Sequence, residues 1–140
     1  MVTNLIQRDH TNAVVTALEA AGLTVGRGVR TASPDGSGAE LPAPCVVVHP
    51  IPGGRRFGDL DDHVKHADLV YQLTCVGETQ AQAEWVRDKT EVLYSGITVA
   101  GRHIDIVRDD FGSSDARLDG TVEPAVFVAM PRYRISSSPA

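Results

Sequence analysis

Apolar and polar residues alternate through the middle of the chain, and this stretch organises the rest of the fold. The alternation predicts a strand over Asp68–Val76 with one drier face, because successive side chains of a strand point to opposite sides. Gly77 ends the strand. Thr79 then suits the N-cap of a helix, and Gln82, three residues later, suits the return half of a capping box. We therefore expect a helix over Thr79–Tyr94.

The apolar residues of this helix recur at helical spacing and indicate the face that packs on the sheet. Trp85 is the only tryptophan of the chain and falls within that stripe. We expect its ring to be wedged between the helix and the sheet. The stripe consists of Ala81, Trp85, Val86, Val92 and Leu93.

A first helix is predicted at the start of the chain, over Asn4–Ala21, with Thr3 as its N-cap. Gly22 suits the left-handed residue that ends a helix, because a residue without a Cβ adopts that conformation at little cost. Leu23 is then expected to fold back on Leu18, which is the usual apolar contact of such a cap.

Short apolar runs predict the remaining strands. Before the central strand come a weak strand within Leu23–Val29 and a buried one at Cys45–His49, which Pro44 and Pro50 bound. Ile51–His66 is expected to be a long hairpin connection.

After the second helix, Gly96 and Ile97 are expected to repeat the glycine cap. A hairpin is predicted from Ile97–Val99 and Arg102–Val107. The last strand, Ala125–Met130, is interrupted by Pro131 before Arg132–Ile135, which indicates a sheet edge or a bend.

These elements predict an α+β fold in a single domain over residues 1–140. Hairpin-length connections favour a mostly antiparallel sheet of four or five strands with two helices packed on one face. Residues 30–44 and 109–123 are expected to be long loops, and residues 136–140 a frayed tail. The first loop is either a surface loop or an arm that becomes ordered against a partner subunit.

Composition narrows the function classes. The chain has 140 residues, of which 42% are hydrophobic and 22% charged, and a net charge of −5 without a basic block. A protein that holds nucleic acid by its phosphates needs clustered Lys and Arg, so that class is not favoured. No apolar run is long enough to span a bilayer, and the N-terminus lacks the pattern of a signal peptide. We expect a protein made and kept in a cytoplasm, unless it leaves inside a larger particle, with Cys45 and Cys75 as small buried residues.

No catalytic, metal-binding or cofactor-binding residue is predicted. The closest approach to a metal pair is His63-x-x-His66, preceded by Asp61 and Asp62, but no Cys or Glu motif follows at zinc spacing, and a solvated loop is the simpler interpretation. There is no nucleophile elbow, and neither cysteine has a polar activating context. We therefore do not expect an enzyme.

Two surface segments have alternative interpretations. Gly53–Arg56 is either a phosphate cradle or part of an exposed hairpin tip that contacts protein through Arg55, Arg56 and Phe57. The acidic residues at Asp59–Asp62 and Asp105–Asp110 form either an ordinary solvated surface or a surface that repels a passing polyanion.

Several short strings, in this order, resemble the tail terminator (tail completion) proteins of long-tailed bacteriophages, the siphophages of actinobacteria in particular. The likeness extends from about Val14 to Ile135 and rests on element order and short strings rather than on a catalytic signature. The strings are Ala20-Ala-Gly22, Pro44-Cys-Val-Val-Val48, Gly53-Gly-Arg-Arg56, Leu60-Asp-Asp62, Ala67-Asp-Leu-Val-Tyr-Gln72, Gln82-Ala-Glu-Trp85 and Arg132-Tyr-Arg134.

The resemblance implies a structural virion protein rather than an enzyme, without a cofactor. Such proteins assemble in the host cytoplasm into a homohexameric ring that caps the head-proximal end of the tail tube and stops its polymerisation. The implied partners are further copies of the chain, the tail tube protein and the neck or head-completion protein, and DNA passes through the channel without specific binding. The alternatives are a neck or head-closure protein, another tail subunit, a small metal-binding enzyme or a soluble ligand-binding domain.

On this interpretation, contact roles are assigned to a few charged and aromatic residues. Arg55, Arg56 and Phe57 are expected to touch a neighbouring subunit or the tube. Arg132 and Arg134 are expected to point outward and pair with acids of the adjacent subunit. The residues expected to line or flank the channel are Asp59, Asp61 and Asp62.

Overall fold

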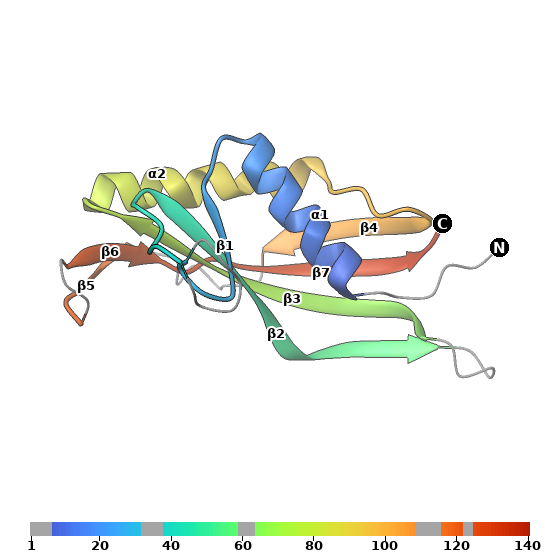
Figure 1. Ribbon diagram of the computed structural model, residues 1–140. Coiled ribbons are helices and arrows are strands. Elements are labelled where there is room, and N and C mark those ends of the chain that lie inside the picture. Colours follow the sequence, from blue (N-terminus) through green and yellow to red (C-terminus); the bar gives the residue numbers. More distant parts are fainter. Residues whose placement is uncertain (1–6, 32–37, 59–63, 109–115, 122–124) are drawn as a thin grey trace.

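The computed structural model describes residues 7–31, 38–58, 64–108, 116–121 and 125–140, with the backbone alone described at 52–58, 64, 65 and 108. Two helices lie on one face of a sheet, which confirms the predicted α+β class (Figure 1). In chain order the elements are α1 (Gln7–Ala20), β1 (Val25–Arg27), β2 (Cys45–Gly58), β3 (Val64–Gly77), α2 (Gln80–Lys89), the 3-10 helix η1 (Thr90–Ser95), β4 (Arg102–Arg108), β5 (Arg117–Asp119), β6 (Val126–Ala129) and β7 (Arg132–Pro139).

In the described residues the sheet has seven strands, more than the four or five expected from the sequence. Strand β3 is its centre, because it pairs with β2 along one edge and with both β6 and β7 along the other. Strand β5 extends the β6 side, and β4 extends the β7 side. All of these pairs are antiparallel, whereas β1 joins β2 in parallel.

The main core lies between the helices and the sheet. From β3 it takes the face that the alternation predicted, which consists of Leu69, Tyr71, Leu73 and Cys75. Helix α1 buries Val14, Val15 and Leu18 against it. Cys45 and Cys75 are buried and are not joined in a disulfide, as predicted. They lie on opposite faces of the sheet, because Cys45 belongs to a second, smaller cluster with Val76 and Val126.

The C-terminal cap of α1 forms as predicted. Gly22 has a φ of 89°, and the Leu23 N–H donates to the Leu18 carbonyl at 3.2 Å. A hydrogen bond to the carbonyl five residues earlier is typical of a helix that ends at a left-handed glycine. It gives a partner to one of the last carbonyls of the helix.

The start of α2 confirms one half of the predicted capping box. The Gln82 N–H donates to Thr79 Oγ1 at 3.1 Å, whereas Gln82 Oε1 accepts from the Glu78 N–H at 2.7 Å rather than from the capping residue. The predicted wedge is wrong, because Trp85 is 46% exposed, with the Lys89 ammonium 5.3 Å from its ring centroid. The buried stripe is Ala83, Val86, Thr90 and Leu93.

The predicted hairpin connection at Ile51–His66 is wrong for most of its length. Strands β2 and β3 continue through it, and Pro50 stands within the ladder, opposite Tyr71. Proline is tolerated there because β1 ends its pairing at Val48, so the missing N–H falls on an edge that no described strand borders. The register shifts between Ile51 and Arg55, and this irregularity contains the Pro-Gly-Gly sequence.

The predicted hairpin of Ile97–Val99 with Arg102–Val107 does not form. Residues 97–99 are not a strand, and β4 pairs with β7 instead. A turn does connect residues 97–99 to β4, since the Arg102 N–H donates to the Val99 carbonyl at 3.0 Å. Side chains alternate along β4, because Ile104 and Ile106 pack against the main core while His103, Asp105 and Val107 are exposed.

The frayed tail predicted at residues 136–140 is wrong, since β7 continues to Pro139 between β3 and β4. Ser137 is 3% exposed, accepts a hydrogen bond from Arg102 Nε at 2.9 Å and lies 2.7 Å from His10 Nε2. Because an arginine N–H can only donate, the Ser137 proton is free to be given to His10. A short stretch rich in serine is thus held by two buried side chains.

Two further expectations concern the second half of the sheet. Strand β5 lies inside the predicted loop 109–123, where no pattern indicated it. Pro131 marks a bend, as expected, since the chain leaves β6 and enters β7 there while both strands pair with β3. Its carbonyl accepts a hydrogen bond from the Leu73 N–H at 2.9 Å.

Candidate functional site

The sheet face opposite the helices carries the candidate site. No described helix covers this face, and its side chains alternate with those of the core along every long strand (Figure 1). The face is mixed in chemistry, with valines near β1 and β6 and polar or charged groups toward β7 and β4. Its members on the polar side are Asp68, Gln72, Arg132, Arg134, Ser136, His103 and Asp105.

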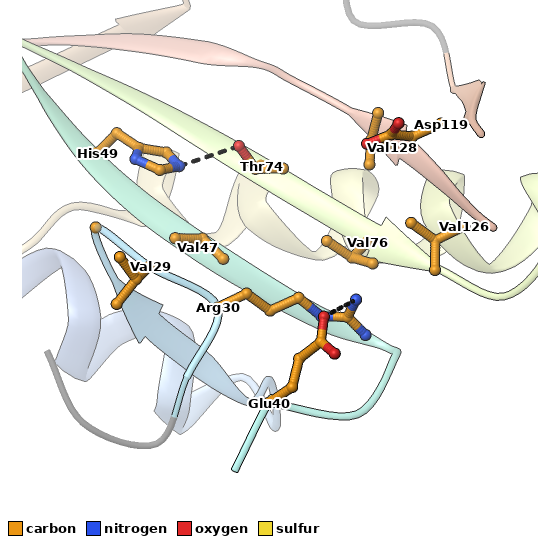
Figure 2. Close-up of a pocket in the computed structure, with 11 residues that line it drawn as sticks. Val29, Arg30, Glu40, Val47, His49, Thr74, Val76, Asp119, Val126 and Val128 are labelled. Atoms are coloured by element: carbon orange, nitrogen blue, oxygen red, sulfur yellow. Dashed lines mark hydrogen bonds and ion pairs between the residues drawn. The ribbon is translucent and has the colours of Figure 1, made fainter. Parts of the chain in front are cut away.

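A hollow of about 240 Å³ occupies the valine-rich part of the face. It is built from three separate regions of the chain: the central strands, the segment after β1 with Glu40, and the β5–β6 hairpin (Figure 2). Valines from all three regions make up five of its eleven lining residues. The residues lining it are Gly28, Val29, Arg30, Glu40, Val47, His49, Thr74, Val76, Asp119, Val126 and Val128.

His49 and Thr74 form the first polar pair of this hollow. Their side chains come from the adjacent strands β2 and β3, with His49 Nε2 3.2 Å from Thr74 Oγ1. Partial burial lowers the pKa of His49 below its ordinary value of 6.5, because a charged imidazole loses hydration there. The ring is therefore mostly neutral at pH 7.

Arg30 and Glu40 form the second pair, on the other side of Val47 and Val76 (Figure 2). Arg30 Nη1 lies 3.0 Å from Glu40 Oε1, and the guanidinium is more shielded than the carboxylate. Arg30 Nε is buried and makes no hydrogen bond within the described part of the chain. Burial raises the pKa of the nearby Cys45 thiol, an effect that Arg30 partly offsets.

Asp119 contributes a carboxylate from β5 at the rim. It accepts hydrogen bonds from both the backbone N–H and the hydroxyl of Thr121, and these bonds lower the pKa of Asp119. Sequence reasoning did not identify Arg30, Glu40 or Asp119. They belong to irregular segments far apart in the sequence, and only the pairing of β1 with β2 and of β5 with β6 brings them together.

The hollow suits non-covalent burial of an apolar group. Its polar groups are a neutral imidazole, a hydroxyl, a carboxylate and an ion pair, and five valines form the apolar part of its wall. A hydroxyl nucleophile activated by histidine also needs a carboxylate to orient the imidazole. In the described residues, no carboxylate is hydrogen-bonded to His49, so this pair lacks the third member of such an arrangement.

The two predicted arginines of β7 lie on the open face and are exposed. Arg132 Nη2 donates to Gln72 Oε1 at 3.1 Å, a contact within the chain. Arg134 stands between Val70 of β3 and Val107 of β4 in the register. Their outward position agrees with the sequence analysis, and their pairing with acids of an adjacent subunit stays a prediction.

The residues assigned to a hairpin tip lie within a strand instead. Arg55, Arg56 and Phe57 are ladder positions of β2, opposite Asp68, Ala67 and His66 of β3. Asp59, Asp61 and Asp62, expected near a channel, fall outside the described residues, and so does His63 of the His-x-x-His pair.

Within the described ranges, no three His, Cys, Asp or Glu side chains gather in a way that could hold a metal ion. The helices described there are also too short or too polar to cross a membrane. No protein-family model and no curated protein matches the chain.

Proposed function

We propose that the protein is a structural subunit of a phage tail, a tail terminator that caps the head-proximal end of the tail tube. The observation that carries this proposal is the β2–β3 hairpin, whose distal end extends beyond α1 (Figure 1). Each strand has 14 residues and so spans about 46 Å at roughly 3.3 Å per residue, more than twice the ~21 Å of α1. Past Val48, the outer edge of β2 has no strand partner among the described elements, and a long edge of this kind is suited to contact a neighbouring protein.

The sequence resemblance supports the same function, because three of its strings lie on this hairpin. Pro44–Val48 leads into β2, Gly53–Arg56 lies in its distal half, and Ala67–Gln72 is the paired stretch of β3. The one-sided architecture also fits a subunit that acts through contacts. Its helices cover one face of the sheet, whereas the other face carries exposed charged groups.

On this proposal the protein forms a homohexameric ring, stops tube polymerisation and joins the tube to the neck or head-completion protein. It resides in the virion after assembly in the host cytoplasm, and DNA passes through the ring without specific binding. A net charge of −5 favours such passage, because like charges reduce adhesion of the polyanion to the channel. No reaction and no cofactor is part of this function.

A charge reversal on the hairpin tests the contact role. The double variant Arg55→Glu/Arg56→Glu is introduced into the virus that encodes the chain, and particles are viewed by electron microscopy. We expect tails of abnormal length or heads without tails, because the reversed charges oppose docking. The matched control is Arg8→Glu/Arg117→Glu, which makes the same charge change at exposed positions of α1 and β5. Normal tails on full heads in the test variant would contradict the assignment.

The same particles separate the terminator from a neck or head-closure protein. A terminator variant gives tails whose length is no longer limited, since nothing ends the tube. A neck variant gives tails of normal length that do not join heads.

A further inference from the structure

Four antiparallel strands, in the order β2–β3–β7–β4, form a continuous part of the sheet with an outermost strand on each side (Figure 1). The registers align one residue of each strand in a single row. This row runs from Arg55 through Asp68 and Ser136 to Asp105. One end of the row is therefore basic and the other acidic, on opposite edges of the same sheet.

The outer edge of β4 is open to pairing. The Leu73 N–H donates to the Pro131 carbonyl, so odd-numbered residues of β3 direct their backbone groups away from β2. The direction of the backbone N–H and C=O groups alternates from residue to residue along a strand. Ser136, opposite Asp68 of β3, therefore directs these groups toward β4, and Asp105, opposite Ser136, directs its own toward β7. Ile104 and Ile106 consequently direct their N–H and C=O groups outward. No strand in the described part of the chain pairs with this edge.

The outer edge of β2 is blocked in one part and open in another. The Val46 N–H donates to the Thr24 carbonyl, and the Val48 carbonyl accepts from the Gly28 N–H. Even-numbered residues of this part of β2 therefore direct their backbone groups away from β3. Pro50 is the next such residue and has no N–H to offer, which blunts the edge beside β1. Beyond the register shift, Arg55 bonds inward to Asp68, and Arg56 directs its backbone outward.

We propose that the β4 edge of one copy pairs with the Arg55–Gly58 edge of the next copy, head to tail, an inference that rests on the proposed ring. In the repeated strand order β4 runs antiparallel to the neighbouring β2, so the joint is an ordinary antiparallel ladder. The register that continues the row places Asp105 beside Arg55 of the partner subunit. Opposite charges directly across a ladder stabilise the pair.

Charge disfavours the two symmetric joints. Pairing two β2 edges would bring Arg55 and Arg56 against the same basic pair, and the β4–β4 register centred on Asp105 would oppose two carboxylates. The joint between unlike edges avoids both. It uses two different surfaces of each subunit, and a rotation that closes turns such a contact into a ring.

Disulfide trapping tests this joint directly. In the purified full-length double variant Arg55→Cys/Asp105→Cys, oxidation should give disulfide-linked species larger than a dimer on a non-reducing gel. The two positions cannot bridge within one chain, because three strand spacings put them roughly 14 Å apart, well beyond disulfide reach. The native cysteines are buried, so we expect them not to form disulfides between chains. The single variants Arg55→Cys and Asp105→Cys are the controls and should remain monomeric.

Charge exchange gives a second reading of the same contact. Arg55→Asp and Asp105→Arg should each reduce the assembled fraction in native mass spectra, and the combination should restore it. The control Asp88→Arg changes an exposed acid of α2 on the helix side of the sheet and should have no effect. Dimers as the largest trapped species, or no trapping together with no rescue by the exchange, would overturn the proposed joint.

Failure of this joint and failure of the tail function are distinguishable. If the protein is found at the head–tail junction of particles but the cysteine pair does not trap it, the proposed function is supported and the proposed joint is refuted. If the cysteine pair traps the protein as predicted but the protein is absent from particles, the proposed joint is supported and the proposed function is refuted.

Discussion

At the residue scale, Gly77 allows the start of α2 to lie close against the end of the central strand. A Cβ at this position would lie 2.3 Å from the Ala83 backbone nitrogen, a distance that no packed structure tolerates. The absence of a side chain therefore lets Ala83 and Val86 reach the core, and it turns Trp85 toward the surface.

Gly77→Ala should lower the free energy of unfolding by at least about 1–3 kcal/mol, the usual cost of overpacking, because the obstacle is backbone rather than a flexible side chain. Urea denaturation followed by circular dichroism measures it. Gly120→Ala is the matched control, since nothing lies within 4 Å of its Cβ and no unusual φ is required there. Equal stability of the two variants would contradict the packing described here.

His49 makes stability depend on pH. Its folded-state pKa is below the ordinary value of 6.5, so the unfolded chain binds a proton first as the pH falls. The contribution of the neutral ring is complete above about pH 6.5. It decreases below that pH and stops changing once the pH is under the folded-state pKa.

His49→Gln should flatten this dependence, because an amide keeps a partner for Thr74 but does not titrate. Thermal melts between pH 7.5 and 5 should show a smaller loss of stability in the variant than in the unchanged protein. His103→Gln is the control, since that ring is exposed on β4. Parallel curves for His49→Gln and the unchanged protein would refute the role of His49.

The residue-scale predictions that held were those with local causes. Gly22 and Leu23 end α1, and Thr79 caps α2, because each signal acts within one helical turn. Trp85 failed because helical spacing alone fits more than one stripe. The backbone contact at Gly77, which is not visible in the periodicity, selects the stripe that contains Ala83.

At the element scale, the last strand holds the sheet together. Strand β7 pairs with β3 on one side and β4 on the other, and its Ser137 joins α1 to β4 through His10 and Arg102. Strand β4 has no other strand partner among the described elements. Loss of β7 would therefore detach it.

Ser137→Ala should cost about 1–3 kcal/mol of stability, since it leaves the buried Arg102 Nε and His10 without their shared partner. Chemical denaturation gives this value. Ser138→Ala, one residue along and less buried, is the control and should change it little. A chain that ends at Ile135 should not fold, in contrast to the small effect expected if the tail were frayed.

Whole elements were harder to predict wherever tertiary pairing overrides local signals. Pro50 suggested a strand end, but an edge tolerates proline. Serines at 136–138 suggested a tail, although strands on both sides order them. The hollow around His49 could not be predicted, because Arg30, Glu40 and Asp119 meet only through the sheet order.

At the scale of the whole molecule, the fold separates two tasks. The helix-covered face supplies the main buried core, whereas the open face, the hairpin and the two outer edges are the surfaces that, on the proposed function, contact other chains. A ring made of such subunits needs no reactive site. On the proposed function, its role follows from where the subunits bind and from the tube growth that they stop.

The position of the protein in an intact particle tests this account most directly. Cryo-electron microscopy of the head–tail junction should show a ring between the tail tube and the neck into which this helix-backed sheet fits, with β4 of each subunit beside β2 of the next. Density at the junction that cannot accommodate the fold, or particles that lack the protein, would contradict the account.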